Sequence, residues 1–99
     1  MSTLELHVLL ATVALQPSAY GNSIAKHVAQ FAEYEPIAAS VYAALTALGR
    51  KGFVKAQAGK PKPIPGGRGI RYWLVTPKGK VALATALHVV AGLTVAASI

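Results

Sequence analysis

The sequence predicts a mainly α-helical domain with one small β-hairpin, and three observations lead to this fold class. Apolar residues recur with the period of an amphipathic helix in four separate segments. Two short segments rich in β-branched and aromatic residues, 53–57 and 70–75, flank a separator that contains three prolines and four glycines. The chain has 99 residues, a length that suits one domain.

The first helix is expected over 4–15, where apolar side chains form two opposite stripes. The first stripe suits the domain core and contains Leu4, Val8, Ala11 and Leu15. The second stripe contains Leu6, Leu9, Leu10 and Val13. A helix that is apolar on both sides must be covered on both sides, so the second stripe predicts contact with another subunit or with the C-terminal helix. Ser2 or Thr3 is expected to cap the helix.

The second helix is expected from about Ala19 to Phe31, with the Ser18 hydroxyl as its N-cap. Its inward face contains Tyr20, Ile24, Val28 and Phe31. The third helix is expected to begin at Pro36, which fits a first turn, and to end at Gly52.

The third helix has two different faces. Its core-facing stripe contains Ile37, Val41, Ala44, Leu45 and Leu48. The opposite face contains Ala39, Tyr42, Ala43, Thr46 and Arg50. Because most of these side chains are small, a grooved partner can approach the helix backbone closely. We therefore interpret this helix as the recognition helix of a DNA-binding domain.

A hairpin with a basic tip is expected next, because the separator AGKPKPIPGGRG is rich in turn residues and carries three cations. Thr76 and Pro77 form a capped helix start, so the last helix is expected from Pro77 to about Ser98. Positions 81–99 contain no Lys, Arg, Asp or Glu.

Charge and hydrophobicity indicate the kinds of partner. The formal charge is +7, and nine of the ten Lys and Arg residues lie between positions 50 and 80, where there is no acid. This distribution predicts a polyanionic partner, either nucleic acid or an anionic membrane surface. Hydrophobic residues make up 54% of the chain, which favours a buried surface between two subunits.

Several classes of site are disfavoured. Cysteine is absent, so disulfides and thiolate metal sites are excluded. His7, His27 and His88 are scattered one per helix, and no nucleophile stands in a pattern with a base, so we expect no metal, no cofactor and no enzymatic activity. The N-terminus lacks the basic region of a signal peptide, which predicts a cytoplasmic protein.

Three helices, a basic hairpin and a fourth helix are the layout of a winged helix-turn-helix domain. In its residues the chain resembles the PadR family of bacterial transcriptional regulators, over roughly Leu4 to Leu83. The resemblance rests on ALQP, AYGNSIAKHV, SVYAALTALGRKGFV and RYWLVTPKG in this order. It implies a homodimer in which a winged helix-turn-helix domain, residues 1–76, binds DNA and a C-terminal dimerisation helix, residues 77–99, pairs the subunits.

The residues expected at DNA follow from the exposed helix face, the basic hairpin and the resemblance. Tyr42 matches a tyrosine that is typical of the family's recognition helix. The full expected set is Ser40, Tyr42, Ala43, Thr46, Arg50, Lys51, Lys60, Lys62, Arg68 and Arg71. Only Arg50 on this helix offers a bidentate base contact, so part of the specificity is expected from DNA shape. The expected dimer interface contains Leu6, Leu9, Leu10, Val13, Leu83, Leu87 and Val90.

The resulting hypothesis is a homodimeric repressor that binds a pseudo-palindromic operator on double-stranded DNA. A small apolar or aromatic effector that releases it is a further expectation from the resemblance. One alternative is a winged-helix module that binds another protein and does not read DNA. A second alternative is a regulator tethered to the membrane by its apolar tail, which the abundance of alanine and the presence of His88 disfavour.

Overall fold

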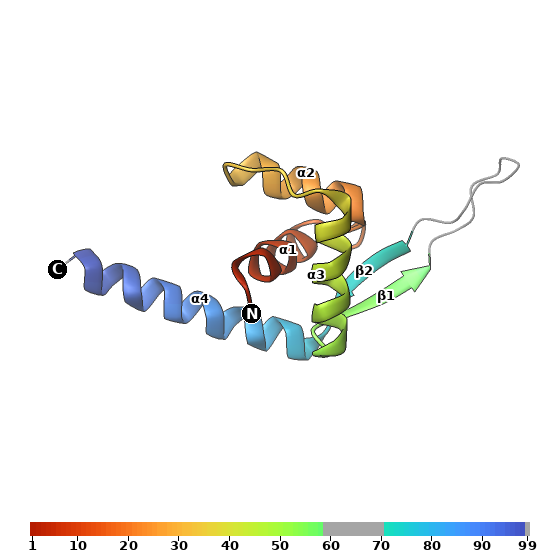
Figure 1. Ribbon diagram of the computed structural model, residues 1–99. Coiled ribbons are helices and arrows are strands. Elements are labelled where there is room, and N and C mark those ends of the chain that lie inside the picture. Colours follow the sequence, from red (N-terminus) through yellow and green to blue (C-terminus); the bar gives the residue numbers. More distant parts are fainter. Residues whose placement is uncertain (59–70, 99) are drawn as a thin grey trace, which may run out of the picture.

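The computed structural model describes residues 1–58 and 71–98 (Figure 1). In this part of the chain there are four helices and a two-stranded antiparallel sheet. In order the elements are α1 (Thr3–Ala14), α2 (Gly21–Phe31), α3 (Ala38–Arg50), β1 (Val54–Ala58), β2 (Arg71–Val75) and α4 (Pro77–Ser98). This order confirms the predicted series of three helices, a hairpin and a fourth helix.

Both ends of α1 are held by side chains. The Ser2 hydroxyl accepts a hydrogen bond from the Glu5 amide at 3.1 Å, and the Glu5 carboxylate accepts one from the Ser2 amide at 3.0 Å. This reciprocal pair is a capping box, which confirms Ser2 as a cap. At the other end Gln16 Nε2 donates to the carbonyls of Thr12 and Trp73, at 2.7 and 2.8 Å. Gln16 therefore ties the end of α1 to β2.

The start of α2 differs from the prediction. Ser18 is not its N-cap; the helix begins at Gly21 and Tyr20 takes the N-cap position. The reason is that Ala19 is fully buried and its carbonyl accepts a hydrogen bond from the Trp73 amide at 2.8 Å, which holds this stretch outside the helix. The Ser23 hydroxyl accepts from the Tyr20 amide at 3.0 Å and so helps to fix the start. Phe31, expected on the inward face of α2, is exposed.

The start of α3 also differs, whereas its end is as predicted. Ile37 was expected in the core, but it is the N-cap residue with extended backbone, and its side chain is 69% exposed. Because the helix begins only at Ala38, Ile37 does not follow the helical stripe. Gly52 has a φ of 78°, and the Phe53 amide donates back to the Leu48 carbonyl at 2.9 Å. This is the expected glycine stop.

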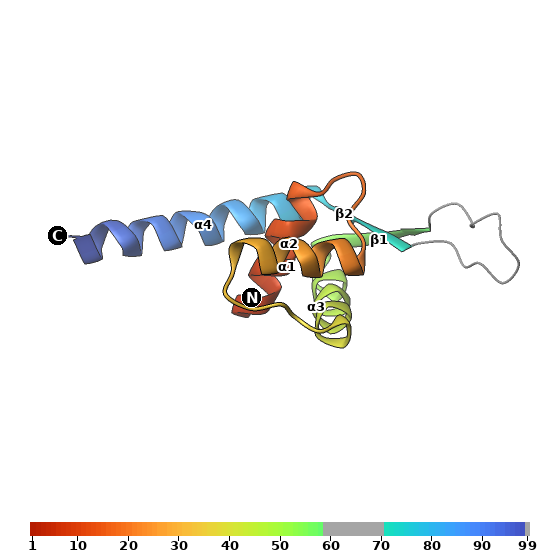
Figure 2. The same cartoon turned by 90° about the horizontal axis from the view of Figure 1, so that it is seen from above.

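The two strands pair from Val54 opposite Val75 to Ala58 opposite Arg71. The Thr76 hydroxyl then accepts from the Gly79 amide at 3.0 Å and donates to the Gly52 carbonyl at 2.6 Å. It thereby caps α4 and joins it to the end of α3. Figures 1 and 2 show that α4 continues well beyond the other helices, with the C-terminus at its far end.

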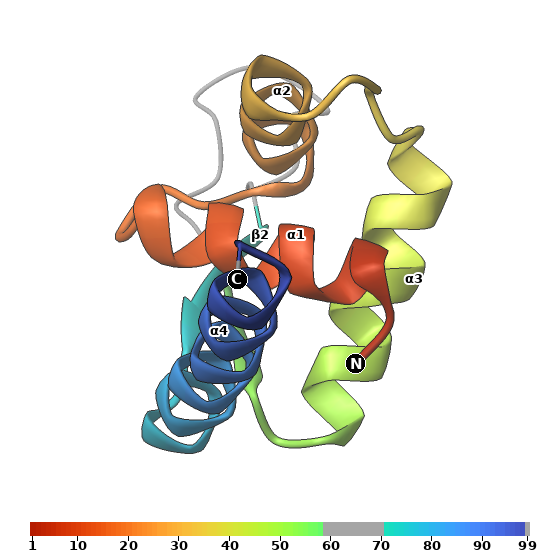
Figure 3. The ribbon, with the colours of Figure 1, turned by 90° about the vertical axis from the view of Figure 1, so that its left-hand side faces the viewer.

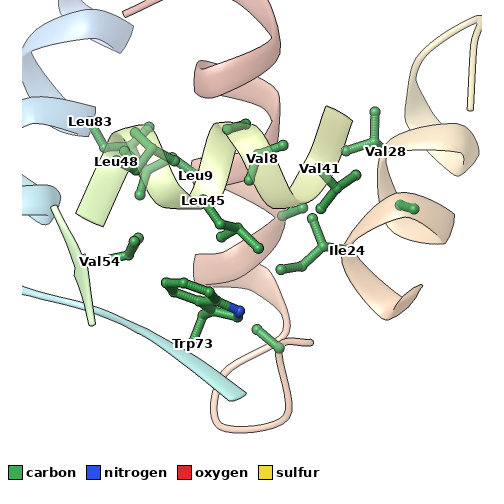
Figure 4. Packing of buried hydrophobic residues seen from close by; sticks show 14 residues of the cluster. Val8, Leu9, Ile24, Val28, Val41, Leu45, Leu48, Val54, Trp73 and Leu83 are labelled. Carbon is green, nitrogen blue, oxygen red and sulfur yellow. The ribbon is translucent and has the colours of Figure 1, made fainter. Parts of the chain in front are cut away.

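The core lies where α3 crosses α1 (Figure 4). Viewed along α4, α1 lies between α2 and α4 (Figure 3). Two residues expected at the dimer interface belong instead to this core: Leu9 is fully buried and Leu83 is 7% exposed. Leu9 lies close to α3 and Leu83 lies beside Leu48, so both side chains are covered within one protomer. Trp73 is buried below Leu45 and belongs to the same core.

Candidate nucleic-acid interface

The face of α3 opposite the core is open and has few large side chains. Ala38, Ala39 and Ala43 are exposed, and Tyr42 stands among them with 55% of its surface exposed. Arg50 is exposed at the end of the helix. This face therefore offers a shallow surface with one aromatic ring near its middle and one cation at its end.

A groove of about 1000 Å³ lies beside this face, between the starts of α2 and α3 and the outer end of β2. Gly21 and Asn22 line it from α2, and Tyr42 lines it from α3. Arg71 lines it from β2. Glu35 also lines this groove, from the segment that precedes α3.

Two helix starts open into the groove. Neither α2 nor α3 has an acidic residue in its first turn, and Ile37 makes no side-chain cap at the start of α3. No Cβ at Gly21 would meet an atom within 4 Å, so the start of α2 is accessible. Free amides and the helix dipole make such starts favourable for phosphate. Sequence reasoning missed Gly21 and Asn22, although the lack of first-turn acids was a signal.

Arg71 and Tyr42 are in direct contact. The Arg71 Nη1 donates a hydrogen bond to the Tyr42 hydroxyl oxygen at 3.1 Å. These residues come from the first position of β2 and from the middle of α3. Two residues that were predicted separately as DNA contacts are thus brought together by the fold.

Lys51 is held within the protomer. Its Nζ lies 3.0 Å from the Glu5 carboxylate, which is mostly covered. The Ser2 amide and, secondly, the Lys51 ammonium hold the pKa of the Glu5 carboxyl below its ordinary value. Lys51 therefore has an internal partner that the sequence analysis did not expect.

The other predicted contact residues are placed as follows. Ser40 and Thr46 are half-buried, and the Thr46 hydroxyl donates to the Tyr42 carbonyl at 2.9 Å. Thr46 therefore keeps only acceptor capacity for a ligand in this rotamer. Lys60, Lys62 and Arg68 lie outside the described residues.

The remaining predicted dimer residues lie on α1 and α4. Leu6 and Leu10 are partly buried against the core, whereas Val13, Leu87 and Val90 are exposed. An apolar cavity of about 320 Å³ lies between α1 and α2. It is lined by His7, Leu10, Ala11, Ala14, His27, Val28, Phe31 and Ala32.

Residues 1–58 and 71–98 contain neither a candidate metal site nor a candidate membrane span. No group of three or more His, Cys, Asp or Glu residues there could hold a metal ion. No helix in the same part of the chain is long and apolar enough to cross a membrane.

A known protein family matches most of the chain. A model of the family described as "Transcriptional regulator PadR-like family" matches residues 9–85. No curated protein sequence matches the chain significantly.

Several solved structures share the fold. A PadR family transcription regulator from Clostridium difficile R20291 is 22% identical, with 90% of each chain covered and a TM-score of 0.71. A transcriptional regulator from Clostridium thermocellum is 16% identical, with 99% of this chain and 95% of that chain covered and a TM-score of 0.77. Bacillus subtilis PadR in complex with operator DNA is 17% identical, with 83% of this chain and 46% of that chain covered and a TM-score of 0.63. The predicted mainly α fold with a two-stranded hairpin is thus confirmed.

Proposed function

Because the chain belongs to the PadR-like family of transcriptional regulators, we propose that it is a homodimeric repressor that binds a pseudo-palindromic site on double-stranded DNA. The family is one of regulators and not of enzymes, in agreement with the expectation from the sequence. Repression would follow from occlusion, because bound protein would cover the site needed by other proteins.

The observation that carries the proposal is the convergence of three elements on one groove. The open face of α3, the start of α2 and the cation of Arg71 all line it. A phosphate backbone is attracted by cations and by helix starts, and an α3 face of small side chains suits entry into a major groove. The operator complex of Bacillus subtilis PadR supports DNA as the ligand of this fold.

Exposed apolar side chains on α4 and α1 support the homodimer. Leu87, Val90 and Leu93 are exposed on the part of α4 that extends beyond the other helices. Val13 adds exposed apolar surface on α1. A second copy would bury this surface, and its α3 would enter the major groove about 34 Å away, one helical turn along DNA.

The proposal also includes a small apolar or aromatic effector that binds the protein and releases it from DNA. The cavity between α1 and α2 supports it, since about 320 Å³ is within the size range of small-molecule sites and the lining is mostly apolar. Phe31, which was expected to face the core, contributes an exposed ring to that lining.

The test is the salt dependence of DNA binding, measured by fluorescence anisotropy with a labelled random duplex. If about six cations per dimer contact phosphates, log K against log salt has a slope of about −5. A slope near zero would contradict DNA binding and favour the protein-interaction module. Lys26→Gln is a suitable comparison, because Lys26 is exposed on α2 and does not line the groove; it should leave the slope unchanged.

A further inference from the structure

The contact between Arg71 and Tyr42 fixes which group can donate to a ligand. A guanidinium has only donors, so Arg71 Nη1 must donate and the Tyr42 oxygen must accept across their 3.1 Å separation. The hydroxyl hydrogen of Tyr42 is not used in this contact. It remains available to an acceptor outside the protein, because the Tyr42 side chain is largely exposed.

Arg71 is also the neighbour that orients the tyrosine hydroxyl. The residues around Tyr42 on the open face of α3 are alanines, namely Ala38, Ala39 and Ala43, which are too short to hold a phenol ring at its tip. Among the described residues, the recorded side-chain hydrogen bond of Tyr42 is the one from Arg71. Arg71 in turn is placed by β2, whose first residue it is, and pairs in register with Ala58.

The positive charge of Arg71 makes the Tyr42 hydroxyl a stronger hydrogen-bond donor. A hydrogen bond donated by a cation polarises the oxygen that accepts it, and this strengthens the donation by the oxygen's own hydrogen. Base edges in the major groove present acceptors at adenine N7, guanine N7 and O6, and thymine O4, whereas cytosine presents a donor there. A polarised tyrosine hydroxyl can therefore donate to adenine, guanine or thymine, whereas at cytosine it would meet another donor.

We propose that Arg71 is a positioning residue that holds and polarises the Tyr42 hydroxyl as a donor to a base acceptor, so that β2 and α3 read DNA as one unit. The inference rests on the proposed DNA-binding function and adds a specificity determinant to it. Arg71 keeps four more N–H donors, so it contacts a phosphate through its remaining hydrogens while it orients Tyr42.

The test is a double-mutant cycle with the full-length protein. Duplexes are first selected from a randomised pool by the unaltered protein, and affinity is then measured for a selected duplex and for a scrambled one. Tyr42→Phe keeps the ring and removes the oxygen, and Arg71→Lys keeps the charge and removes the guanidinium geometry. We expect each change to lower the ratio of the two affinities roughly threefold to tenfold. The combined variant should lower it no further than the larger single effect, since both changes remove the same contact.

A matched control separates positioning from charge. Lys55 is an exposed cation on the neighbouring strand β1, where it lies opposite Leu74 and not opposite Arg71. Lys55→Gln should leave the affinity ratio unchanged, even if it weakens binding to both duplexes. Arg71→Lys should preserve the salt slope while it lowers the ratio. A lower ratio of the affinities for the selected and the scrambled duplex in Lys55→Gln would overturn the inference.

The outcomes distinguish the two proposals. If the unaltered protein binds DNA with a salt-dependent affinity but the effects of Tyr42→Phe and Arg71→Lys multiply, the positioning role is overturned and the DNA-binding function stands. If the unaltered protein binds no duplex, both proposals are overturned. In the free protein, the ¹³Cζ resonance of Tyr42 should shift in Arg71→Lys and stay in place in Lys55→Gln. No shift in Arg71→Lys would overturn the positioning contact without reference to DNA.

Discussion

Gly79 shows how the absence of one side chain sets the position of α4. A Cβ at this position would clash with the carbonyl oxygen of Phe53 and lie 2.9 Å from its carbonyl carbon. The Val75 side chain would lie at 3.0 Å. These neighbours are mostly backbone and cannot move away cheaply, so the first turn of α4 approaches the start of the hairpin only because position 79 is glycine.

Gly79→Ala should therefore destabilise the protein by about 1–3 kcal/mol, the usual effect of forcing an extra group into a packed site. The measurement is the free energy of unfolding from urea denaturation followed by circular dichroism. Gly92→Ala is the matched control, because Gly92 lies in the same helix and a Cβ there meets nothing within 4 Å. It should stabilise the helix by up to about 1 kcal/mol. Equal effects of the two substitutions would contradict the close approach at Gly79.

Glu5 links two helices through its charge. Its carboxylate accepts from the Ser2 amide at the start of α1 and pairs with Lys51 at the end of α3. Both partners favour the charged form, which explains the lowered pKa of this carboxyl. The stabilisation is full above the ordinary carboxyl pKa and is lost as the pH falls through the lowered folded-state value.

Glu5→Gln should accordingly reduce the loss of stability on acidification. Glutamine can still accept from the Ser2 amide but does not titrate, so the fall in the free energy of unfolding between about pH 6 and about pH 3 should be smaller than in the unaltered protein. Thermal unfolding over this pH range measures it. Glu33→Gln serves as control, because Glu33 is exposed and has no recorded hydrogen bond in the described part of the chain. Identical pH profiles of Glu5→Gln and the unaltered protein would refute this role.

At the scale of elements, the exposed apolar surface of α4 is the feature that the single protomer does not explain. Leu87 is 44% exposed, and its helix carries no charge from position 81 onward. The proposed dimer accounts for this surface by covering it with a second copy.

Leu87→Lys should weaken the dimer by about 100-fold or more. Burial of a leucine side chain contributes roughly 1.5–3 kcal/mol, and in a two-fold symmetric interface the loss occurs twice. Sedimentation equilibrium gives the dissociation constant. Thr85→Lys is the control, since Thr85 is also exposed on α4 but lies on a different side of the helix from Leu87. The idea fails if Leu87→Lys leaves the dimer as tight as Thr85→Lys does.

The sequence was sufficient for the type and order of the elements, but it was less reliable at helix starts. The Gly52 stop and the Thr76–Pro77 start depend on local chemistry, and the structure confirms both. The start of α2 depends on the hydrogen bond from Trp73 to the buried Ala19, which joins residues far apart in the chain. Periodicity alone cannot detect such a contact, and for this reason Ser18 was wrongly expected to be the cap.

At the scale of the whole molecule, the residues of the candidate site were partly predictable but their partners were not. Tyr42 and Arg50 followed from the helical period, and the structure leaves both exposed. The contacts of Tyr42 with Arg71 and of Lys51 with Glu5 join residues 29 and 46 positions apart. They depend on how β2 and α1 pack against α3, which a single sequence does not specify. In the same way, packing against α3 and α1 placed Leu9 and Leu83 in the protomer core and not at the dimer interface.

The central claim is that two copies of this chain bind one DNA duplex. The most direct test is size-exclusion chromatography with light scattering on the full-length protein, alone and with a 30-base-pair duplex at low and high salt. We predict a dimer with twice the mass of the chain, a complex of one dimer with one duplex at low salt, and separate dimer and duplex at high salt. A dimer that does not bind the duplex at either salt concentration, or a monomer in every condition, would contradict the account.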